Sequence, residues 1–170
     1  MRKKSPSETL SPLTALSPVD GRYGDRVSNL RNLMSEFGLI KYRVSVELQW
    51  ILALSESESI PEVNNFSEKT QIFIQEIINN FSLDDAEAVK VIERQTNHDV
   101  KAIEYFLKEL FKDNHELASV VEFIHFGCTS EDINNLAYAL MLRDARAKIL
   151  LPAIEELING LTNHAKALAN

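Results

Sequence analysis

The sequence has few residues that interrupt helices and few that cross-link chains. Glycine and proline occur five times each in 170 residues, and cysteine occurs once, at Cys128. A single cysteine excludes an intramolecular disulfide and a cysteine-based zinc cluster, and it is typical of a reducing compartment. No apolar run approaches the roughly 18–20 residues of a membrane-spanning helix, and no apolar stretch follows the charged first residues as in a secretory signal. We therefore expect a cytoplasmic protein with no membrane partner.

Positive charge is also in short supply. Lysine and arginine number 18 against 25 aspartate and glutamate residues, which gives a net charge of −7 at pH 7. This balance excludes general nucleic-acid binding, because that requires a basic face to neutralise phosphates. A single phosphorylated metabolite needs only a few local donors and stays possible. Apolar residues make up 45% of the chain, which is enough for a folded core.

What the sequence does contain is helical periodicity. Apolar residues recur at spacings of three and four after residue 28, and no segment shows the alternation of a strand, so we predict an all-α fold. Residues 28–54 are expected to form a helical unit that breaks near Ser35, where Ser35 and Gly38 weaken the helix. Further helices are expected over 67–80, from Ser82 onward, around 100–110 and over 115–124.

The last predicted helix is unusually long. From Glu131 to the end of the chain the apolar residues keep a near-heptad spacing, and Thr129 or Ser130 is expected to cap the start. Pro152 is expected to kink this helix rather than end it. A helix of roughly 35–40 residues cannot bury its apolar stripe alone and is typical of a bundle. No stop signal precedes Asn170, so we expect that the chain is cut inside this helix.

These patterns divide the chain into three parts. We predict a flexible tail over residues 1–10 and an N-terminal helical domain over 11–118. Residues 119–170 are then the beginning of a long-helix bundle domain, which is truncated here.

Three polar turns interrupt the helical background, and each has an ordinary structural alternative. In the first turn, over residues 21–24, two glycines flank Arg22 and Tyr23, and the arginine fork matches a phosphate or a carboxylate. In the second turn, over residues 96–99, Asn97 can donate and accept hydrogen bonds, His98 can carry a proton, and Asp99 can orient that imidazole or hold a ribose hydroxyl. The alternatives are a plain turn with an exposed arginine, and a capping turn with Asn97 or Asp99 as the cap.

The third turn, over residues 127–134, places the hydroxyls of Thr129 and Ser130 and free backbone N–H groups at the start of the longest helix. The helix dipole favours an anion there, and the alternative is a plain N-cap. His125 is interpreted as a packed core histidine, and Cys128 has no basic neighbour that would activate it as a nucleophile. His98 and Asp99 lack a third ligand at suitable spacing, so no metal site is predicted.

The stretches that contain these turns resemble adenylosuccinate lyases of the bacterial type, within the fumarase/aspartase superfamily of homotetrameric helical lyases. The matching stretches are residues 13–23, 92–108 and 123–135. The resemblance implies cleavage of adenylosuccinate to AMP and fumarate, and release of fumarate from the succinylated carboxamide intermediate of purine synthesis, by acid–base elimination without metal or cofactor. By position the resemblance implies that Arg22 and Tyr23 bind the nucleotide. It implies that Asn97, His98 and Asp99 form a second substrate-binding segment, in which His98 supports the general acid. It also implies that Thr129 and Ser130 bind the succinyl carboxylate.

The resemblance also implies what this polypeptide lacks. The family's general-acid histidine lies in a Thr-His-Gly-Gln-type stretch and its general-base serine in a Gly-Ser-Ser-x-Met-Pro loop, and neither occurs in the 170 residues. We therefore expect no turnover from this polypeptide alone. Because the family builds each active site from three subunits, we expect a homo-oligomer, a homotetramer at full length, with a purine nucleotide as its small-molecule partner.

Two other interpretations stay open. A helical interaction module without catalytic descent explains the long apolar stripe equally well, but not the joint occurrence of the three polar turns. A sister fumarate-releasing enzyme, such as argininosuccinate lyase or fumarase, is the closer alternative. The Thr-Asn-His-Asp and Thr-Ser-Glu-Asp segments favour adenylosuccinate lyase by family pattern.

Overall fold

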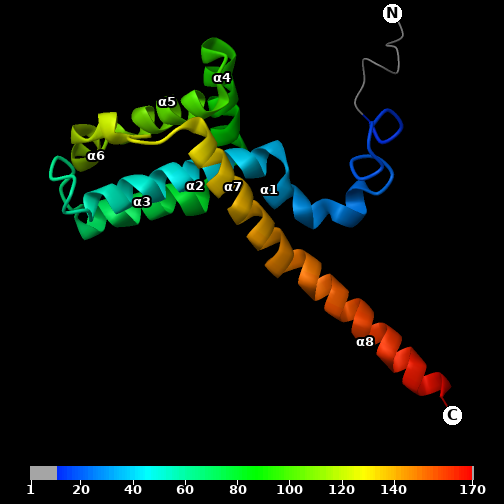
Figure 1. The fold of residues 1–170 in the computed structure, drawn as a ribbon. Coiled ribbons are helices and arrows are strands. Elements are labelled where there is room, and N and C mark those ends of the chain that lie inside the picture. Colours follow the sequence, from blue (N-terminus) through cyan, green and yellow to red (C-terminus); the bar gives the residue numbers. More distant parts are fainter. Residues whose placement is uncertain (1–10, 170) are drawn as a thin grey trace, which may run out of the picture.

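The computed structural model describes residues 11–169, and within this range the chain forms helices and no strand, which confirms the all-α prediction. The predicted tail, residues 1–10, lies outside the described residues. No helix within 11–169 is both long and apolar enough to cross a bilayer. In chain order the elements are the 3-10 helix η2 (Gly24–Leu30), α1 (Arg31–Met34), α2 (Glu36–Ser55), α3 (Glu68–Asn80), α4 (Leu83–Thr96), α5 (Asp99–Phe111), α6 (His115–Ser119), the 3-10 helix η3 (Val121–Phe123), α7 (Ser130–Ala145), the π-helix η4 (Arg146–Leu150) and α8 (Leu151–Leu168) (Figure 1).

The predicted break near Ser35 is confirmed. Ser35 has an extended backbone between α1 and α2, and its hydroxyl accepts a hydrogen bond from the Gly38 amide as the N-cap of α2. Gly38 is needed at this break, because a Cβ there would lie 2.5 Å from the Leu33 carbonyl oxygen. The absent side chain therefore lets the end of α1 approach the first turn of α2 closely.

One apolar core joins α2 to α3, α4, α5 and α6 (Figure 1). Leu48 of α2, Ile74 of α3 and Leu107 of α5 are all 0% exposed. Burial of such side chains contributes about 1.5–3 kcal/mol each to stability. The helix predicted over 115–124 begins at His115 as expected, but its predicted length is wrong. The helix α6 ends at Ser119, and buried Val120 leaves helical geometry before the short η3.

The helices that share this core, α2 to α6, are called the body. The segment from α7 through η4 to α8 is a continuous helical arm that extends away from the body (Figure 1). Pro152 does not end the helix, as predicted. Proline has no N–H, and its ring would clash with the carbonyl four residues earlier in a regular α-helix. The π turn accommodates it, since the Leu151 amide bonds to the Arg146 carbonyl five residues back. The first half of the arm packs on α2, whereas every residue of α8 is exposed.

Candidate functional site

The start of α7 has the predicted cap. Thr129 is the N-cap: its hydroxyl accepts from the Glu131 amide at 3.1 Å, and its own amide donates to Asp132 Oδ2 at 2.8 Å. This capping box satisfies two backbone donors and fixes the backbone of the turn. The half-buried Ser130 hydroxyl makes no hydrogen bond within residues 11–169. A free hydroxyl thus lies at the positive end of a helix of 16 residues, where an anion is favoured.

His98 caps the start of α5, so neither Asn97 nor Asp99, the residues named in the capping alternative, caps this helix start. Asn97 instead adopts the left-handed conformation, with φ 51°, and ends α4 by donating its amide to the Glu93 carbonyl at 2.8 Å. His98 Nδ1 accepts from the Lys101 amide at 3.1 Å. In the neutral imidazole, the remaining proton is therefore on Nε2. The side chain is 52% exposed, so it can donate that proton outward.

Asp99 is engaged by the protein itself. Its carboxylate accepts from Arg43 Nη2 at 2.6 Å and from the Val100 amide at 2.8 Å. Burial alone would raise the pKa of Asp99, but the Val100 amide and the Arg43 guanidinium hold it below its ordinary value. This carboxylate is therefore ionised at neutral pH and anchors the turn, while the adjacent His98 side chain is free to face solvent.

Arg43 joins the starts of α5 and α7. Its guanidinium is buried, bonds to Asp99 through Nη2, and donates from Nε to Asn134 Oδ1 at 2.9 Å. Asn134 lies one turn beyond Ser130, so one side chain of α2 fixes both helix starts. A small apolar cluster packs beneath the same junction: Val46, Val100 and Ile133. Two of the three predicted turns are thereby brought together.

The first predicted turn, over residues 21–24, stands apart from this junction within the chain. Residues 11–30 extend away from the body, and η2 packs mainly against α1 (Figure 1). The Arg22 guanidinium lies over the Tyr23 ring at 4.8 Å, and both side chains are exposed. The two flanking glycines are packed closely by other parts of the chain. A Cβ on Gly21 would meet the Pro12 carbonyl at 2.9 Å, and one on Gly24 would meet the Arg31 guanidinium at 2.7 Å.

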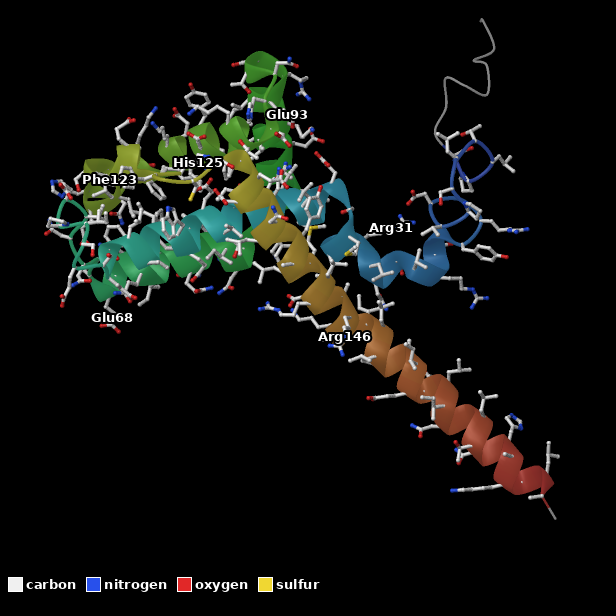
Figure 2. The ribbon with its side chains drawn as sticks, in the orientation of Figure 1. Arg31, Glu68, Glu93, Phe123, His125 and Arg146 are labelled. Carbon is white, nitrogen blue, oxygen red and sulfur yellow. The ribbon has the colours of Figure 1, made fainter. Side chains whose placement is uncertain are left out.

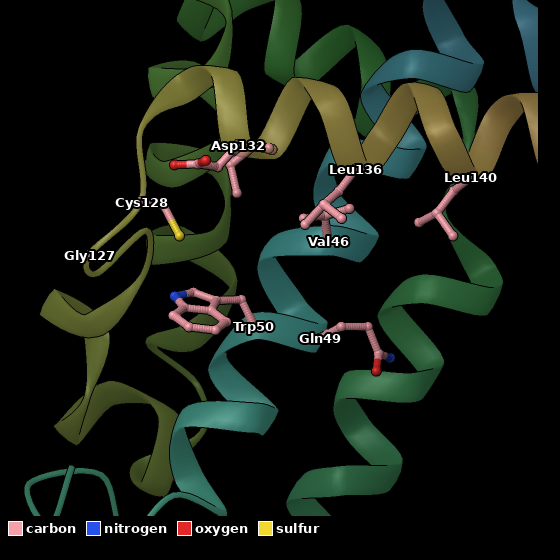
Figure 3. Close-up of a pocket in the computed structure, with 9 residues that line it drawn as sticks. Val46, Gln49, Trp50, Gly127, Cys128, Asp132, Leu136 and Leu140 are labelled. Carbon is pink, nitrogen blue, oxygen red and sulfur yellow. The ribbon is translucent and has the colours of Figure 1, made fainter. Parts of the chain in front are cut away.

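An apolar hollow of 620 Å³ lies beside the α7 start, between α2 and α7. Figure 3 shows the Trp50 indole close to the Cys128 thiol at one end and Leu140 at the other. Burial raises the pKa of Cys128, and the carboxylates of Glu47 and Asp132 raise it further. The thiol therefore stays protonated at neutral pH, which agrees with the interpretation that it is no nucleophile. Within residues 11–169, no three histidine, cysteine or acidic side chains cluster in a way that could hold a metal ion.

Sequence reasoning missed the polar side chains of α2. Arg43, Glu47 and Trp50 are spaced by four and three residues and so share one helix face. Arg43 bonds to α5 and α7, Glu47 Oε1 lies 2.6 Å from His125 Nδ1, and Trp50 Nε1 donates to the Phe126 carbonyl at 2.9 Å. One signal was available, because α2 carries apolar residues on more than one face, which indicates a helix buried nearly all round.

Comparison with known proteins shows that the chain is similar to a group of bacterial enzymes. The chain is 54% identical over 157 residues to the adenylosuccinate lyase of Haemophilus influenzae, which covers 92% of this chain and 34% of the relative. The adenylosuccinate lyase of Escherichia coli K12 is 54% identical over 156 residues, and that of Buchnera aphidicola from Acyrthosiphon pisum is 49% identical over 152 residues. The chain spans about a third of the length of these relatives.

The family comparison covers nearly the whole polypeptide. A sequence model of the protein family described as lyase matches residues 21–170. This range includes all three polar turns and the complete arm. The chain therefore belongs to the lyase family.

Proposed function

We propose that the joined starts of α5 and α7 bind the succinyl part of adenylosuccinate, and that the chain is the N-terminal part of an enzyme that releases fumarate from it. The observation that carries this proposal is the Arg43 junction, which fixes the His98 cap and the Thr129–Ser130 turn on one side of α2. Relatives that are about half identical to this chain bear the name adenylosuccinate lyase.

The chemistry of the junction suits a dicarboxylate. Elimination of fumarate places negative charge on the carboxylate next to the carbon that loses its proton, and pre-aimed donors stabilise that charge. The Ser130 hydroxyl and the Ser130 backbone amide, which takes no part in the capping box, supply such donors. His98, with its proton on Nε2, supplies another and supports protonation of the departing nitrogen. Asn97 contacts substrate from the same turn, whereas Asp99 acts by holding that turn to Arg43.

The remaining parts of the site come from other copies of the chain in this proposal. Arg22 and Tyr23 are exposed on a segment that extends away from the junction, where they are available to a neighbouring protomer and its nucleotide. The exposed leucines of α8, including Leu157 and Leu161, offer an apolar surface for such an assembly. We propose a homotetramer at full length, in the cytoplasm, that acts in purine and AMP biosynthesis. In this proposal the N-terminal helical domain ends at residue 118, and the bundle domain that forms the tetramer begins at residue 119.

We further propose that the 170 residues do not turn over adenylosuccinate by themselves, because the acid and base stretches are absent from the sequence. The test is incubation of pure protein with adenylosuccinate while fumarate release is followed by absorbance. We expect no release above the uncatalysed rate. Sustained release that follows protein concentration would contradict this part of the proposal.

Ligand binding tests the junction directly. Fumarate should bind the wild-type chain weakly, and Ser130→Ala should weaken binding about tenfold, since hydrogen bonds to charged groups are worth about 1.5–3 kcal/mol. Ser119→Ala is a matched control, because that hydroxyl donates to the Glu116 carbonyl at the end of α6, away from the junction. Titration monitored by NMR gives both affinities. Equal weakening by the two variants, or none by Ser130→Ala, would count against the proposal.

A second candidate function is an interaction module, favoured by the solvent exposure of every residue of α8. This alternative predicts self-association or partner binding through α8 with no affinity for fumarate or AMP. The lyase proposal predicts that the self-associated chain binds AMP, and that this binding weakens when Arg22 or His98 is changed to alanine. The two ideas are therefore separated by the same titrations.

A further inference from the structure

The strap over residues 124–129 leads into the site turn, and its backbone is strained at His125. His125 has φ 64° and Gly127 has φ 71°, both in the left-handed region that favours glycine. Figure 2 marks His125 on this strap, which leads into α7. A residue with a Cβ adopts such a conformation only where its surroundings hold it. The strap therefore needs contacts that keep it in place.

Those contacts come from α2. Glu47 Oε1 lies 2.6 Å from His125 Nδ1, and Trp50 Nε1 donates to the Phe126 carbonyl at 2.9 Å. Two consecutive strap residues are thus held by two side chains that share a face of one helix. Thr129 follows within the next turn, so its position depends on where α2 holds the strap.

Glu47 is an unusual residue for this task. It is 1% exposed, and its Oε2 atom has no hydrogen-bond partner among the residues that the structure describes. A buried, half-satisfied carboxyl costs free energy, so a core built for stability alone would favour an apolar residue. The partner, His125, has a side chain that is only 15% exposed, so it is turned to Glu47 and not to the solvent side of the turn.

We propose that Glu47 and His125 are positioning residues, whose hydrogen bond holds the strap so that Thr129 and Ser130 present their donors to the substrate carboxylate. The proposal rests on the proposed function for what the turn binds, but not for how the strap is held. Glu47 acts through His125 and touches no substrate. Two neighbouring side chains of α2 act in the same way. Arg43 holds the start of α7 through Asn134, and Trp50 holds Phe126, the strap residue after His125.

The test uses the full 170-residue chain and three substitutions of buried glutamates. Glu47→Leu removes the hydrogen bond without altering the strap sequence, and Glu47→Gln keeps an oxygen that can accept from His125. Glu104→Leu is the matched control, because Glu104 is also buried but pairs with Lys101 of its own helix at 2.6 Å. Amide hydrogen exchange at Cys128 and Thr129 reports local opening of the strap, and exchange at Phe106 in α5 reports opening of the body.

We expect Glu47→Leu to speed exchange at Cys128 and Thr129 about tenfold more than at Phe106, and to weaken fumarate binding about tenfold, as loss of a supporting group behind a ligand contact typically does. Glu47→Gln and Glu104→Leu should both stay within about twofold of wild type at the strap. Equal acceleration at the strap and at Phe106 would indicate a purely structural role and would overturn the proposal. Unchanged exchange at the strap in Glu47→Leu would also overturn it.

His125→Gly provides the second variant, in case Glu47→Leu does not fold. Glycine suits the positive φ but removes the Glu47 contact, so faster strap exchange than in His125→Asn is expected, because asparagine tolerates this conformation and keeps a donor. Equal strap exchange in the two variants would overturn the positioning role. A wild-type chain that fails to bind fumarate would contradict the proposed function, while the exchange comparison would still decide how the strap is held.

Discussion

The body and the distal arm carry similar apolar residues in opposite environments. Leu48 and Leu107 in the body are 0% exposed, whereas Leu157 and Leu161 on α8 are 61% and 62% exposed. Both regions are regular helix, so helical periodicity alone does not tell which stripe is buried within one chain. The comparison teaches that the body is stabilised by its own core, while the apolar stripe of α8 is left uncovered by the rest of the described chain.

The largest predicted effect contrasts the same substitution in the two regions. Leu107→Ala should lower the free energy of unfolding by about 3 kcal/mol, because it removes buried methyl groups and leaves a cavity. Leu161→Ala should lower it by less than about 0.5 kcal/mol, because this side chain is already in water. Denaturant unfolding of the two variants measures both values at low protein concentration. Similar losses would show that the arm is packed against the body or against another copy.

The second prediction removes the link between the two helix starts. Arg43→Met keeps most of the buried volume but leaves Asp99 and Asn134 without their partner. We expect a loss of about 2 kcal/mol in the free energy of unfolding. Fumarate binding should weaken as well, since both turns lose their common anchor. Arg146→Met, on the exposed surface of η4, is the control and should change neither quantity. An Arg43→Met chain with wild-type stability and wild-type fumarate affinity would show that the Arg43 contacts contribute to neither.

The third prediction concerns the place where the arm leaves the body. Asp144 accepts from Tyr42 at 2.7 Å and from Lys148 at 2.7 Å. Burial alone would raise the pKa of Asp144, but hydrogen bonds from Lys148, Tyr42 and Arg143 lower it to about 2, from an ordinary value of 3.8. The depressed folded-state pKa means that this stabilisation is present above about pH 4 and is lost as the pH falls toward 2.

Asp144→Asn should therefore lower the free energy of unfolding by about 1–2 kcal/mol at pH 7, with a smaller difference at low pH. Unfolding curves of both proteins at several pH values measure this dependence. A difference that stays constant between pH 7 and pH 3 would show that the carboxylate charge contributes nothing to this contact.

The smallest predicted change in stability comes from a charge on the exposed stripe. Leu157→Glu should leave the free energy of unfolding of the isolated chain within about 0.5 kcal/mol of wild type, because the site is solvated. The same substitution should reduce self-association, since a carboxylate resists burial in an apolar contact. Sedimentation velocity measures the association. Unchanged association in Leu157→Glu would show that α8 is not the contact surface.

Local features of the fold could be predicted from the sequence where a single side chain determines where a helix begins or breaks. Ser35 with Gly38 predicted the break before α2, and the Thr129 cap followed from a hydroxyl ahead of acidic residues. The His98 cap was not predictable in this way, since capping statistics favour asparagine and aspartate. Asp99 follows the cap as the first residue of α5 and accepts from Arg43, which lies 56 residues earlier in the chain.

The candidate site was predictable as pieces but not as an assembly. Thr129, Ser130 and His98 could be recognised from turn chemistry and helix starts, because these are local properties. The pattern of α2 indicates a buried helix, but it does not tell what Glu47 and Arg43 bind, because their partners lie 56 to 91 residues away in the chain. The separation of Arg22 from the junction likewise depends on how residues 11–30 leave the body, which no local pattern encodes.

The most direct test of the Arg43 junction as a carboxylate site is an NMR map of fumarate binding on the isotope-labelled chain. We predict that saturating fumarate shifts the amides of Ser130 and Glu131 and the imidazole of His98 together, with one common dissociation constant. Shifts confined to residues away from the starts of α5 and α7, or none at saturating ligand, would contradict the assignment of this junction as the binding site.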